Sequence, residues 1–369
     1  MKKLLAILAL AATMAHAQTT TIIDDQTVPA GATVPMTLAD GAQSTTTYTV
    51  SAPETYAPLK GDHSGDGTFY YNDSTIPYFP TADGTQMVAI FGATWVSKFT
   101  GSDLFHLLPF ATRDLVTIIR PANYATTNTV ESGYDYNGDW MQQAVRAPDG
   151  TLVGLVHGEN HWFADGIYGE WYSGLIWTST DDGTTWTDGG VAASSPKPLV
   201  HTWGGFAIGS LFWDHVANRW IGYYMNYPLV SYDEHAAPGT WYGMDSGGNF
   251  TIHMDPTQQP VGYTTSLGLS SSYGYNHITW NSYLSKYVMT YIHNGGTVKL
   301  FAVFSDDGIH WSPEQLFYSE DTGAKMNYPQ IIGDTSTTSG QDAYLVYERA
   351  PAIYTTNNND IIVRKIHFN

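Results

Sequence analysis

The chain has 369 residues, a formal net charge of −19, no cysteine and an aromatic content of 14%. A balance this acidic argues against nucleic acid and against an anionic membrane surface as partners, because both attract clusters of Lys and Arg. Without disulfides the fold must be held together by burial, and a chain of this length can bury a sufficient core.

The first residues are typical of an export signal. Lys2 and Lys3 precede an apolar run at 4–14, and residues 15–17 read Ala-His-Ala, which resembles a cleavage site. The apolar run is shorter than the roughly 20 residues that span a bilayer. We therefore expect residues 1–17 to be a signal peptide and the mature protein to be secreted or periplasmic.

Strand patterns dominate the rest of the chain, and helical periodicity is nearly absent. Residues 18–55 are rich in Thr, Ala and Gly, and we expect a linker with one or two strands there. Further on, five similar strands each follow a polar turn, and each has a partner strand before the turn. The first strands are predicted at 74–79, 141–146, 206–213, 277–280 and 328–332, and the second strands at 86–91, 152–156, 220–225, 287–292 and 343–347.

A turn motif recurs about every 60–70 residues, which is the length of one four-stranded propeller blade with generous loops. Its clearest copy is Ser-Thr-Asp-Asp-Gly-Thr-Thr-Trp at 179–186. A shorter copy lies at 305–311, and weaker copies lie at 112–118 and 243–250. Ser and Asp can cap backbone N–H groups in such a turn, Gly adopts positive φ, and Trp fills the space between strands.

These patterns predict an all-β fold, a five-bladed β-propeller of four-stranded blades formed by residues 56–369 as a single domain. The last segment, 327–369, contains about three predicted strands and no turn motif. One strand of the last blade is therefore missing, and we expect residues 18–55 to supply it and close the ring.

Blade geometry predicts where polar side chains gather. If the first and second strands of each blade join at the bottom, the start of each first strand and the end of each second strand share the top rim. Carboxylates, histidines and aromatic rings concentrate at these positions, which is typical of a binding site. They include Asp73, Trp95, Asp139, Trp140, His157, Glu159, His161, Trp162, Glu170, Trp203, Tyr275, Asn276, His277, Tyr328 and Arg349.

Three short motifs carry a family resemblance. Residues 112–118 read Thr-Arg-Asp-Leu-Val-Thr-Ile, residues 273–277 read Tyr-Gly-Tyr-Asn-His with Tyr-Ile-His at 291–293, and residues 72–77 read Asn-Asp-Ser-Thr-Ile-Pro. Each is similar to a motif of one enzyme group, which is named below. The first resembles the Asp-Leu turn that closes blade 1, and the second resembles the Gly-x-Gly-His strand with its later Tyr-His. The third occupies the place of the blade-1 Asp-Pro strand. The chain thus resembles the five-bladed propeller glycoside hydrolases of the arabinanase, β-xylosidase and levansucrase type, with Asp-box-type turns.

The resemblance implies glycoside hydrolysis by carboxylates at the mouth of the central channel. In that group a blade-1 Asp is the base or nucleophile, a blade-2 Asp tunes the pKa of the acid, and a blade-3 Glu is the acid. Asp73 matches the first position. Asp139 lies near the second, where Gln143 stands, and the blade-3 strand at 204–209 has no Glu. His277 matches a histidine at the channel centre, where the resemblance allows a structural Ca²⁺, although we expect no required cofactor.

The residues themselves suggest two candidates for the proton donor, whose pKa must be raised by burial or by a neighbouring negative charge. Glu159 has histidine and tryptophan neighbours, and Glu170 precedes Trp-Tyr. The segment 157–161 is not an H-E-x-x-H motif and no helix surrounds it, so we expect its histidines on different faces and predict no metal ligands. The expected catalytic residues are Asp73, Asp139, Glu159, Glu170 and His277. The expected substrate-binding residues are Trp95, Trp140, His157, Trp162, Trp203, Asn276, Tyr328 and Arg349.

Two other functions remain open beside a glycoside hydrolase. A propeller-type polysaccharide lyase would use His or Tyr as the base of a β-elimination, with Arg146, Arg349, His157 and Tyr328 as candidates. The missing blade-3 Glu favours a lyase, and the low arginine content argues against it. A non-catalytic carbohydrate-binding propeller would explain the missing carboxylates. In each case we expect a polysaccharide or oligosaccharide partner and a monomeric protein.

Overall fold

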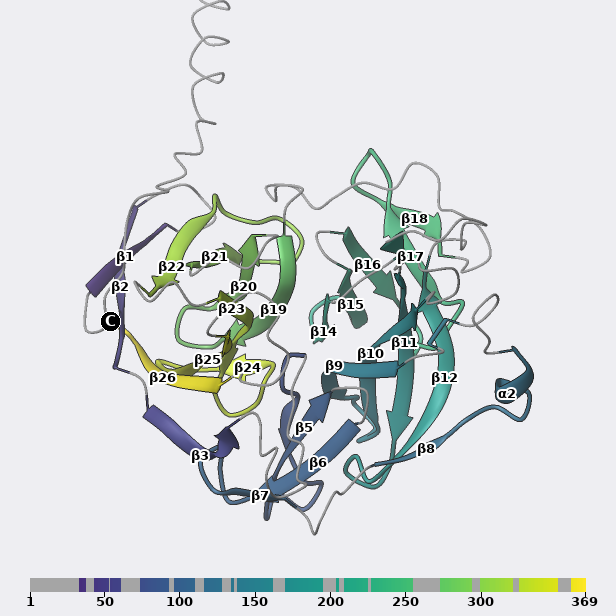
Figure 1. The fold of residues 1–369 in the computed structure, drawn as a ribbon. Coiled ribbons are helices and arrows are strands. Elements are labelled where there is room, and N and C mark those ends of the chain that lie inside the picture. The colour runs from purple at the N-terminus through teal and green to yellow at the C-terminus, as the bar shows by residue number, and fades with distance from the viewer. Residues whose placement is uncertain are drawn as a thin grey trace, which may run out of the picture.

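The computed structural model describes residues 33–37, 43–52, 54–60, 74–92, 96–109, 116–127, 134–135, 138–161, 170–194, 204–205, 209–224, 227–254, 273–293, 299–320, 325–350 and 360–369. Five sheets stand around a central axis as blades (Figure 1). The predicted all-β fold, a five-bladed propeller, is confirmed. We call the edge of the ring where the innermost strands begin the top rim, and the opposite edge the bottom.

The first three blades follow one another along the chain. Blade 1 consists of β4 (Tyr78–Pro80), β5 (Met87–Gly92), β6 (Val96–Gly101) and β7 (Leu107–Pro109). Blade 2 consists of β9 (Gly138–Arg146), β10 (Leu152–His161), β11 (Glu170–Ser179) and β12 (Thr185–Ala193), with β8 (Thr117–Ile119) and β13 (Gly204–Gly205) added in parallel. Blade 3 consists of β14 (Gly209–Asp214), β15 (Arg219–Tyr224), β16 (Tyr227–Ser231), β17 (Trp241–Met244) and β18 (Phe250–His253).

The last two blades complete the ring. Blade 4 consists of β19 (Tyr273–Asn281), β20 (Lys286–His293), β21 (Lys299–Ser305) and β22 (Gln315–Ser319), with β24 (Thr338–Ser339) beside β19. Blade 5 consists of β23 (Lys325–Ile332), β25 (Asp342–Ala350), β26 (Asp360–Phe368), β2 (Gln43–Val50) and β1 (Thr33–Thr37), and β3 (Glu54–Lys60) also pairs with β26.

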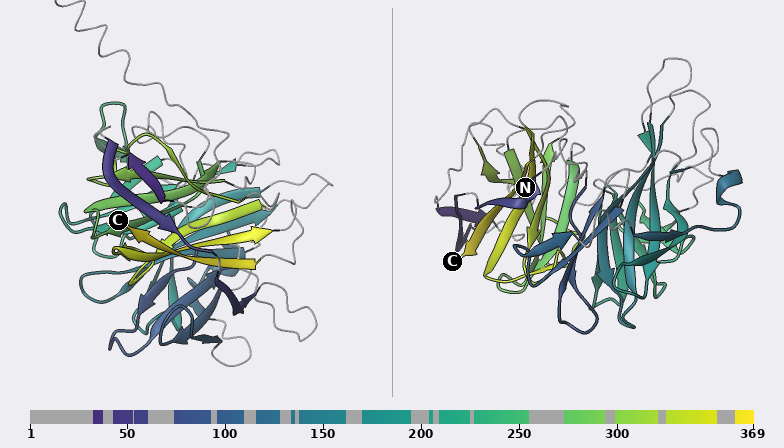
Figure 2. Two further views of the ribbon diagram at one scale, coloured as in Figure 1. Left: turned by 90° about the vertical axis from the view of Figure 1, so that its left-hand side faces the viewer. Right: turned by 60° about the horizontal axis from the view of Figure 1, so that its bottom comes forward.

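The N-terminal segment closes the ring, as the sequence predicted. β2 pairs antiparallel with β26, the last strand, so that Tyr48 lies opposite Phe368; Figure 2 shows the purple N-terminal strands beside the yellow C-terminal strand in this sheet. Tyr48 also contacts blade 4. Its hydroxyl donates to the Phe317 carbonyl oxygen at 2.6 Å, and its ring stacks on that of Phe317 with centroids 4.4 Å apart. One tyrosine of the closing strand thus joins blade 5 to blade 4.

The hydrophobic core lies between the blades. Five clusters of buried side chains fill the five spaces between neighbouring sheets. Trp186, the tryptophan of the clearest turn motif, lies between blades 1 and 2 with Val88 and Ile90. Since every blade buries both faces against its neighbours, the innermost strands are free to present polar groups to the channel.

The turn motif is held by its own polar groups. The Gly183 backbone N–H donates to Ser179 Oγ at 3.0 Å, and the Thr185 N–H donates to Asp181 Oδ1 at 2.8 Å. Gly183 has a φ of 76°, and Trp186 Nε1 donates to the Gly183 carbonyl oxygen at 3.1 Å. The turn at 305–311 repeats the Ser and Asp bonds, whereas residues 112–115 of the first weak copy lie outside the described residues.

Helix is limited, in the described ranges, to α2 (Tyr124–Thr127), as the weak helical periodicity predicted. No helix in this part of the chain has the length and apolar character needed to cross a membrane.

Candidate functional site

A cluster of histidines and carboxylates lies at the top rim of blade 2. Alternate residues of a strand share a face, so His157, Glu159 and His161 project from the same side of β10. In the neighbouring β11, Tyr172 lies opposite Glu159 and Glu170 lies opposite His161. We call these five residues the His–Glu cluster. The expectation that the two histidines lie on different faces was wrong, because residues i and i+4 of a strand point the same way.

Hydrogen bonds join the members of the His–Glu cluster. Glu159 accepts from His157 Nε2 through Oε1 at 2.9 Å, and from His161 Nε2 through Oε2 at 2.5 Å. His161 Nε2 also lies 3.5 Å from Glu170 Oε1. The Tyr172 hydroxyl donates to the other oxygen of Glu170, Oε2, at 2.8 Å. Each carboxylate therefore has one oxygen turned toward His161.

The protonation of Glu159 differs from the sequence expectation. Burial favours the neutral acid, but the bonds from His157 and His161 outweigh it and lower the pKa of Glu159 to about 2. Conversely, although burial favours neutral imidazole, Glu159 and Glu170 raise the pKa of His161. Glu159 was expected to have a raised pKa as a proton donor. It is instead an ionised carboxylate, because its two nearest partners are imidazole N–H donors.

Aromatic rings border the His–Glu cluster. Trp140, on the innermost strand β9, lies nearly parallel to the His161 ring at a centroid distance of 6.5 Å and edge-on to His157 at 6.0 Å. The rings of His157 and Tyr172 are 5.0 Å apart. The cluster thus combines charged groups with flat apolar surfaces, the combination expected of a site for a ring-shaped polar ligand.

Blades 4 and 5 bring two tyrosines to the same mouth. Tyr275 and Tyr328 meet edge to face, with ring centroids 4.6 Å apart, and both adopt a positive φ, 55° and 50°. Each lies at a register shift of an innermost strand, β19 or β23. Such a backbone conformation costs about 1–3 kcal/mol and is concentrated at functional sites. Tyr275 also helps to raise the pKa of Tyr172, as a smaller cause than burial, Glu170 and Glu159.

His277 lies deeper, where blades 2, 4 and 5 meet. Gln143 Nε2 donates to His277 Nε2 at 3.1 Å, and Gln143 Oε1 accepts from Ser336 Oγ at 2.9 Å. Burial lowers the pKa of His277 to about 3, so the imidazole is neutral. Gln143, where the resembled group has an Asp, therefore serves as a neutral bridge. The neighbouring Asn276 pairs with Ser210 of blade 3 at 3.1 Å.

The described residues around His277 do not fit a Ca²⁺ site. Calcium prefers six to eight oxygen ligands that include carboxylates. Burial lowers the pKa of His277, a hydrogen bond to the Ser336 backbone opposes this shift, and no described carboxylate contributes to it. The donors at hand are the amide of Gln143 and the Ser336 hydroxyl, which are neutral.

Asp139 belongs to a separate buried group on the other face of blade 2, toward blade 1. Arg120 donates to Asp139 through Nη2, and through Nη1 to Asp135 at 2.8 Å and to Asp188 at 3.0 Å. Tyr124 also donates to Asp135, at 3.0 Å. Burial, with Asp135 next, raises the pKa of Asp139. Since Trp140 is on the opposite face, Asp139 does not share the face of the His–Glu cluster.

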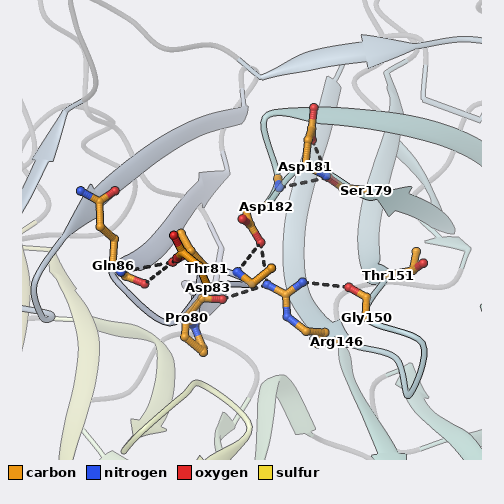
Figure 3. A network of polar contacts seen from close by, with 12 residues as sticks. Pro80, Thr81, Asp83, Gln86, Arg146, Gly150, Thr151, Ser179, Asp181 and Asp182 are labelled. Atoms are coloured by element: carbon orange, nitrogen blue, oxygen red, sulfur yellow. Dashed lines mark hydrogen bonds and ion pairs between the residues drawn. The ribbon is translucent and has the colours of Figure 1, made fainter.

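Arg146 lies at the bottom of the ring, which removes it from the lyase hypothesis. Figure 3 shows its guanidinium bonded to the carbonyl oxygens of Gly150 and Pro80 and to Asp182, each at 2.8 Å. At about 3.3 Å per residue, β9 carries Arg146 roughly 20 Å from Trp140 at the top rim. Arg146 therefore ties the turns of blades 1 and 2 together and cannot neutralise a substrate at the rim.

The remaining expected residues divide into two groups. Arg349 is on blade 5, and its Nη1 lies 3.5 Å from Glu320 Oε2. Tyr328 is buried at the channel mouth. Four residues lie outside the described part of the chain, so their expected roles stay predictions: Asp73, Trp95, Trp162 and Trp203. Tyr172 was not expected in the site and His161 had no assigned role. The alternation of β10 and its pairing with β11 are the signals that could have identified both.

Comparison with known proteins establishes the fold only. No family model matches the sequence, and no curated protein is significantly similar to it. A family 117 glycoside hydrolase, Zg3597 from Zobellia galactanivorans, is similar in structure at a TM-score of 0.54 and 11% identity, covering 87% of this chain and 90% of that chain. The exo-β-1,3-galactanase Pc1,3Gal43A of Phanerochaete chrysosporium matches at 0.48 and 12%, covering 86% of this chain. A β-fructofuranosidase of Schwanniomyces occidentalis matches at 0.47 and 13%, covering 84%.

This chain spans 64% of the length of the galactanase and 58% of that of the fructofuranosidase. The resemblance to five-bladed propeller glycoside hydrolases is thus confirmed as a distant likeness in architecture, at identities that do not transfer an activity.

Proposed function

We propose that this protein is an exported carbohydrate-active hydrolase whose substrate binds at the top rim above blade 2. The observation that carries the proposal is the His–Glu cluster, where two carboxylates and two imidazoles lie beside Trp140 on one face. Aromatic rings offer stacking surfaces for sugar rings. The same fold in a family 117 glycoside hydrolase supports a glycan substrate, and the composition of residues 1–17 supports export.

In this proposal the His–Glu cluster lies on one side of the scissile bond. The nearest oxygens of Glu159 and Glu170 lie within 4.8 Å of each other. The two carboxylates of an inverting pair stand about 6.5–9.5 Å apart, with a water between them. Glu159 and Glu170 are too close for that arrangement, so in this proposal they act together on the leaving-group side, where they raise the pKa of His161 and the His161 imidazolium gives its proton to the leaving oxygen.

The opposite side of the bond then needs a carboxylate from another blade, and Asp73 is our candidate. Ser74, which follows it, is buried, and the Thr75 hydroxyl donates to the Gln142 carbonyl oxygen of β9. The Ile76 N–H donates to Gln330 of blade 5 at 2.8 Å. The chain immediately after Asp73 therefore runs between the innermost strands of blades 2 and 5, next to the channel.

A glycan-release screen, with products analysed by mass spectrometry, tests this function. The wild-type protein is expected to release fragments that are each heavier by one water than the corresponding unit of the polymer. Asp73→Asn and Glu170→Gln are each expected to slow release by at least about 100-fold, the effect of losing an acid–base or nucleophilic group, while circular dichroism stays unchanged.

Asp342→Asn is the matched control, because this exposed carboxylate pairs only with the surface residue His367 in the contacts described, at 2.7 Å. It should leave release unchanged. Products that absorb in the ultraviolet through a new double bond would identify a lyase, and binding without turnover would identify a carbohydrate-binding propeller. Near-normal release by a folded Asp73→Asn variant would remove Asp73 from the mechanism.

A further inference from the structure

The His–Glu cluster has the atomic arrangement of a metal site. We propose that Glu159, His161 and Glu170 bind one divalent first-row metal ion at the top rim of blade 2. One ligand atom from each residue, a carboxylate oxygen from each Glu and a nitrogen from His161, lies within 4.8 Å of the other two. Metal–ligand bonds of about 2.0–2.2 Å, as for Zn²⁺ with nitrogen and oxygen, can bridge such a set after small side-chain movements.

The direction in which each carboxylate points supports this assignment. Glu159 uses Oε1 to accept from His157 and directs Oε2 toward His161, whereas Glu170 uses Oε2 to accept from Tyr172 and directs Oε1 toward His161. The two oxygens and the imidazole nitrogen thus point at one region. Adjacent strands in fixed register hold all three, because His161 and Glu170 are directly opposite each other in the β10–β11 ladder.

His157 and Tyr172 act as the outer partners that metal ligands normally have. A carboxylate that binds a metal is usually oriented by a hydrogen bond to its second oxygen. His157 provides this bond for Glu159 at 2.9 Å, and Tyr172 provides it for Glu170 at 2.8 Å. The Trp140 ring, nearly parallel to His161, limits the rotation of the imidazole.

The ligand types indicate which ions fit. Two carboxylates balance the charge of a divalent cation, and the imidazole favours Zn²⁺ or another transition metal over Ca²⁺ and Mg²⁺, which prefer oxygen alone. With three protein ligands, an ion of this kind keeps at least one position for water or substrate.

A second group with the same types of residue lies at the bottom of the ring, and it is much less suited to binding a metal ion. Asp149, Glu234 and His235 also approach within 4.8 Å, but Asp149 and Glu234 are exposed. Asp149 accepts from the backbone of Thr151 at 2.9 Å through Oδ1, and through Oδ2 from the Thr151 hydroxyl at 3.0 Å and from His235 at 2.9 Å. Because Asp149 and Glu234 are exposed to solvent, this group serves as the comparison in the experiment.

Metal binding does not depend on the function proposed above, but its role in catalysis rests on that function. An ion held by the His–Glu cluster would act as a Lewis acid on the leaving oxygen of the substrate or would bind and polarise a water. It would occupy the position that His161 otherwise fills with its N–H bond to Glu159.

Isothermal titration of Zn²⁺ into the full chain, freed of metal by a chelator, tests the proposal. The wild type is expected to bind one ion per chain. His161→Asn and Glu170→Gln should each weaken binding by more than about 100-fold. Tyr172→Phe keeps the ring and removes only the outer hydroxyl, and it should weaken binding by about 10-fold, the lower end of the range for outer partners. His235→Asn should bind as the wild type does.

Three results would overturn the proposal: no stoichiometric binding by the wild type, unchanged binding by His161→Asn and Glu170→Gln, or loss of binding in His235→Asn. Circular dichroism of each variant checks that the variant is folded. The test of Zn²⁺ binding by the wild type does not depend on any variant. Glycan release measured with and without chelator separates the two proposals. Release without any Zn²⁺ binding would refute the metal site alone, whereas Zn²⁺ binding without release would refute the hydrolase alone.

Discussion

Asp139 shares one guanidinium with two other carboxylates, and this makes its ionisation expensive. Asp135, Asp139 and Asp188 all pair with Arg120, and Tyr124 donates to Asp135. Three negative charges therefore face one positive charge in a buried region. Burial is the main cause that raises the pKa of both Asp135 and Asp139, and the closeness of Asp135 raises that of Asp139 further.

A raised pKa has a definite effect on stability. Between the ordinary value and the raised value, the folded protein binds more protons than the unfolded chain, so the free energy of unfolding falls as the pH rises through this range. Asp139→Asn removes the titrating group but keeps an oxygen that can accept from Arg120. The variant should therefore be at least as stable as the wild type at pH 7, and its relative stability should decrease as the pH is lowered toward the ordinary carboxyl range.

Urea denaturation at several pH values between about 4 and 7 measures this difference, because a carboxyl group ordinarily titrates near the lower limit. Asp342→Asn, at the surface, controls for the loss of one negative charge. A stability difference between wild type and Asp139→Asn that stays constant over the whole range would contradict the raised pKa.

Strand β11 illustrates how blades are fitted together. Gly174 lies in the middle of this strand, opposite His157, where Tyr224 of blade 3 packs against blade 2. A Cβ atom at this position would stand 1.9 Å from Cε1 of Tyr224, which is fully buried and cannot move outward. The absence of a side chain is thus what allows the two sheets to approach.

Gly174→Ala is therefore expected to destabilise the protein by about 1–3 kcal/mol, the usual cost of overpacking a filled core. The free energy of unfolding from urea titration measures it. Gly340→Ala is the control, because the new Cβ would meet its nearest described atom, Ser282 Oγ, at 3.9 Å, an ordinary contact. Equal effects of the two substitutions would show that close approach at Gly174 is not the constraint.

The closed ring depends on the contact between its two ends. Tyr48 is fully buried and joins the N-terminal strand to the last blade and to blade 4. Loss of its side chain opens a cavity where β2 meets β26 and blade 4. Tyr48→Ala should lower the free energy of unfolding by about 3–5 kcal/mol, the range for deleting a buried aromatic ring.

Tyr48→Phe separates the two contributions, since it keeps the stacking on Phe317 and loses one hydrogen bond, worth about 0.5–1.5 kcal/mol. Tyr283→Ala, at a residue that is 46% exposed, should change stability by less than about 0.5 kcal/mol. Closure by β2 would not be important for stability if Tyr48→Ala behaved like Tyr283→Ala in thermal and urea denaturation.

Local patterns in the sequence were sufficient for the architecture. Turn motifs at 179–186 and 305–311, together with five strand pairs, identified the blades, and the shortage of strands after residue 327 identified the closing strand. The hydrogen bonds of a turn and the alternation of a strand involve only a few neighbouring residues, so both can be predicted from a single segment of the sequence. The order of the strands in each blade placed Glu159 and Glu170 at the rim, although the pKa of Glu159 was expected in the wrong direction.

The ionisation and the partners of these groups were decided only by the tertiary structure. Glu159 is ionised because His161 and His157 donate to it, His277 is neutral because it is buried beside Gln143 of another blade, and Asp139 pairs with Arg120. Such effects arise from atoms a few ångströms apart that belong to distant segments. Their distances follow from strand register and from the closure of the ring, which no single segment specifies.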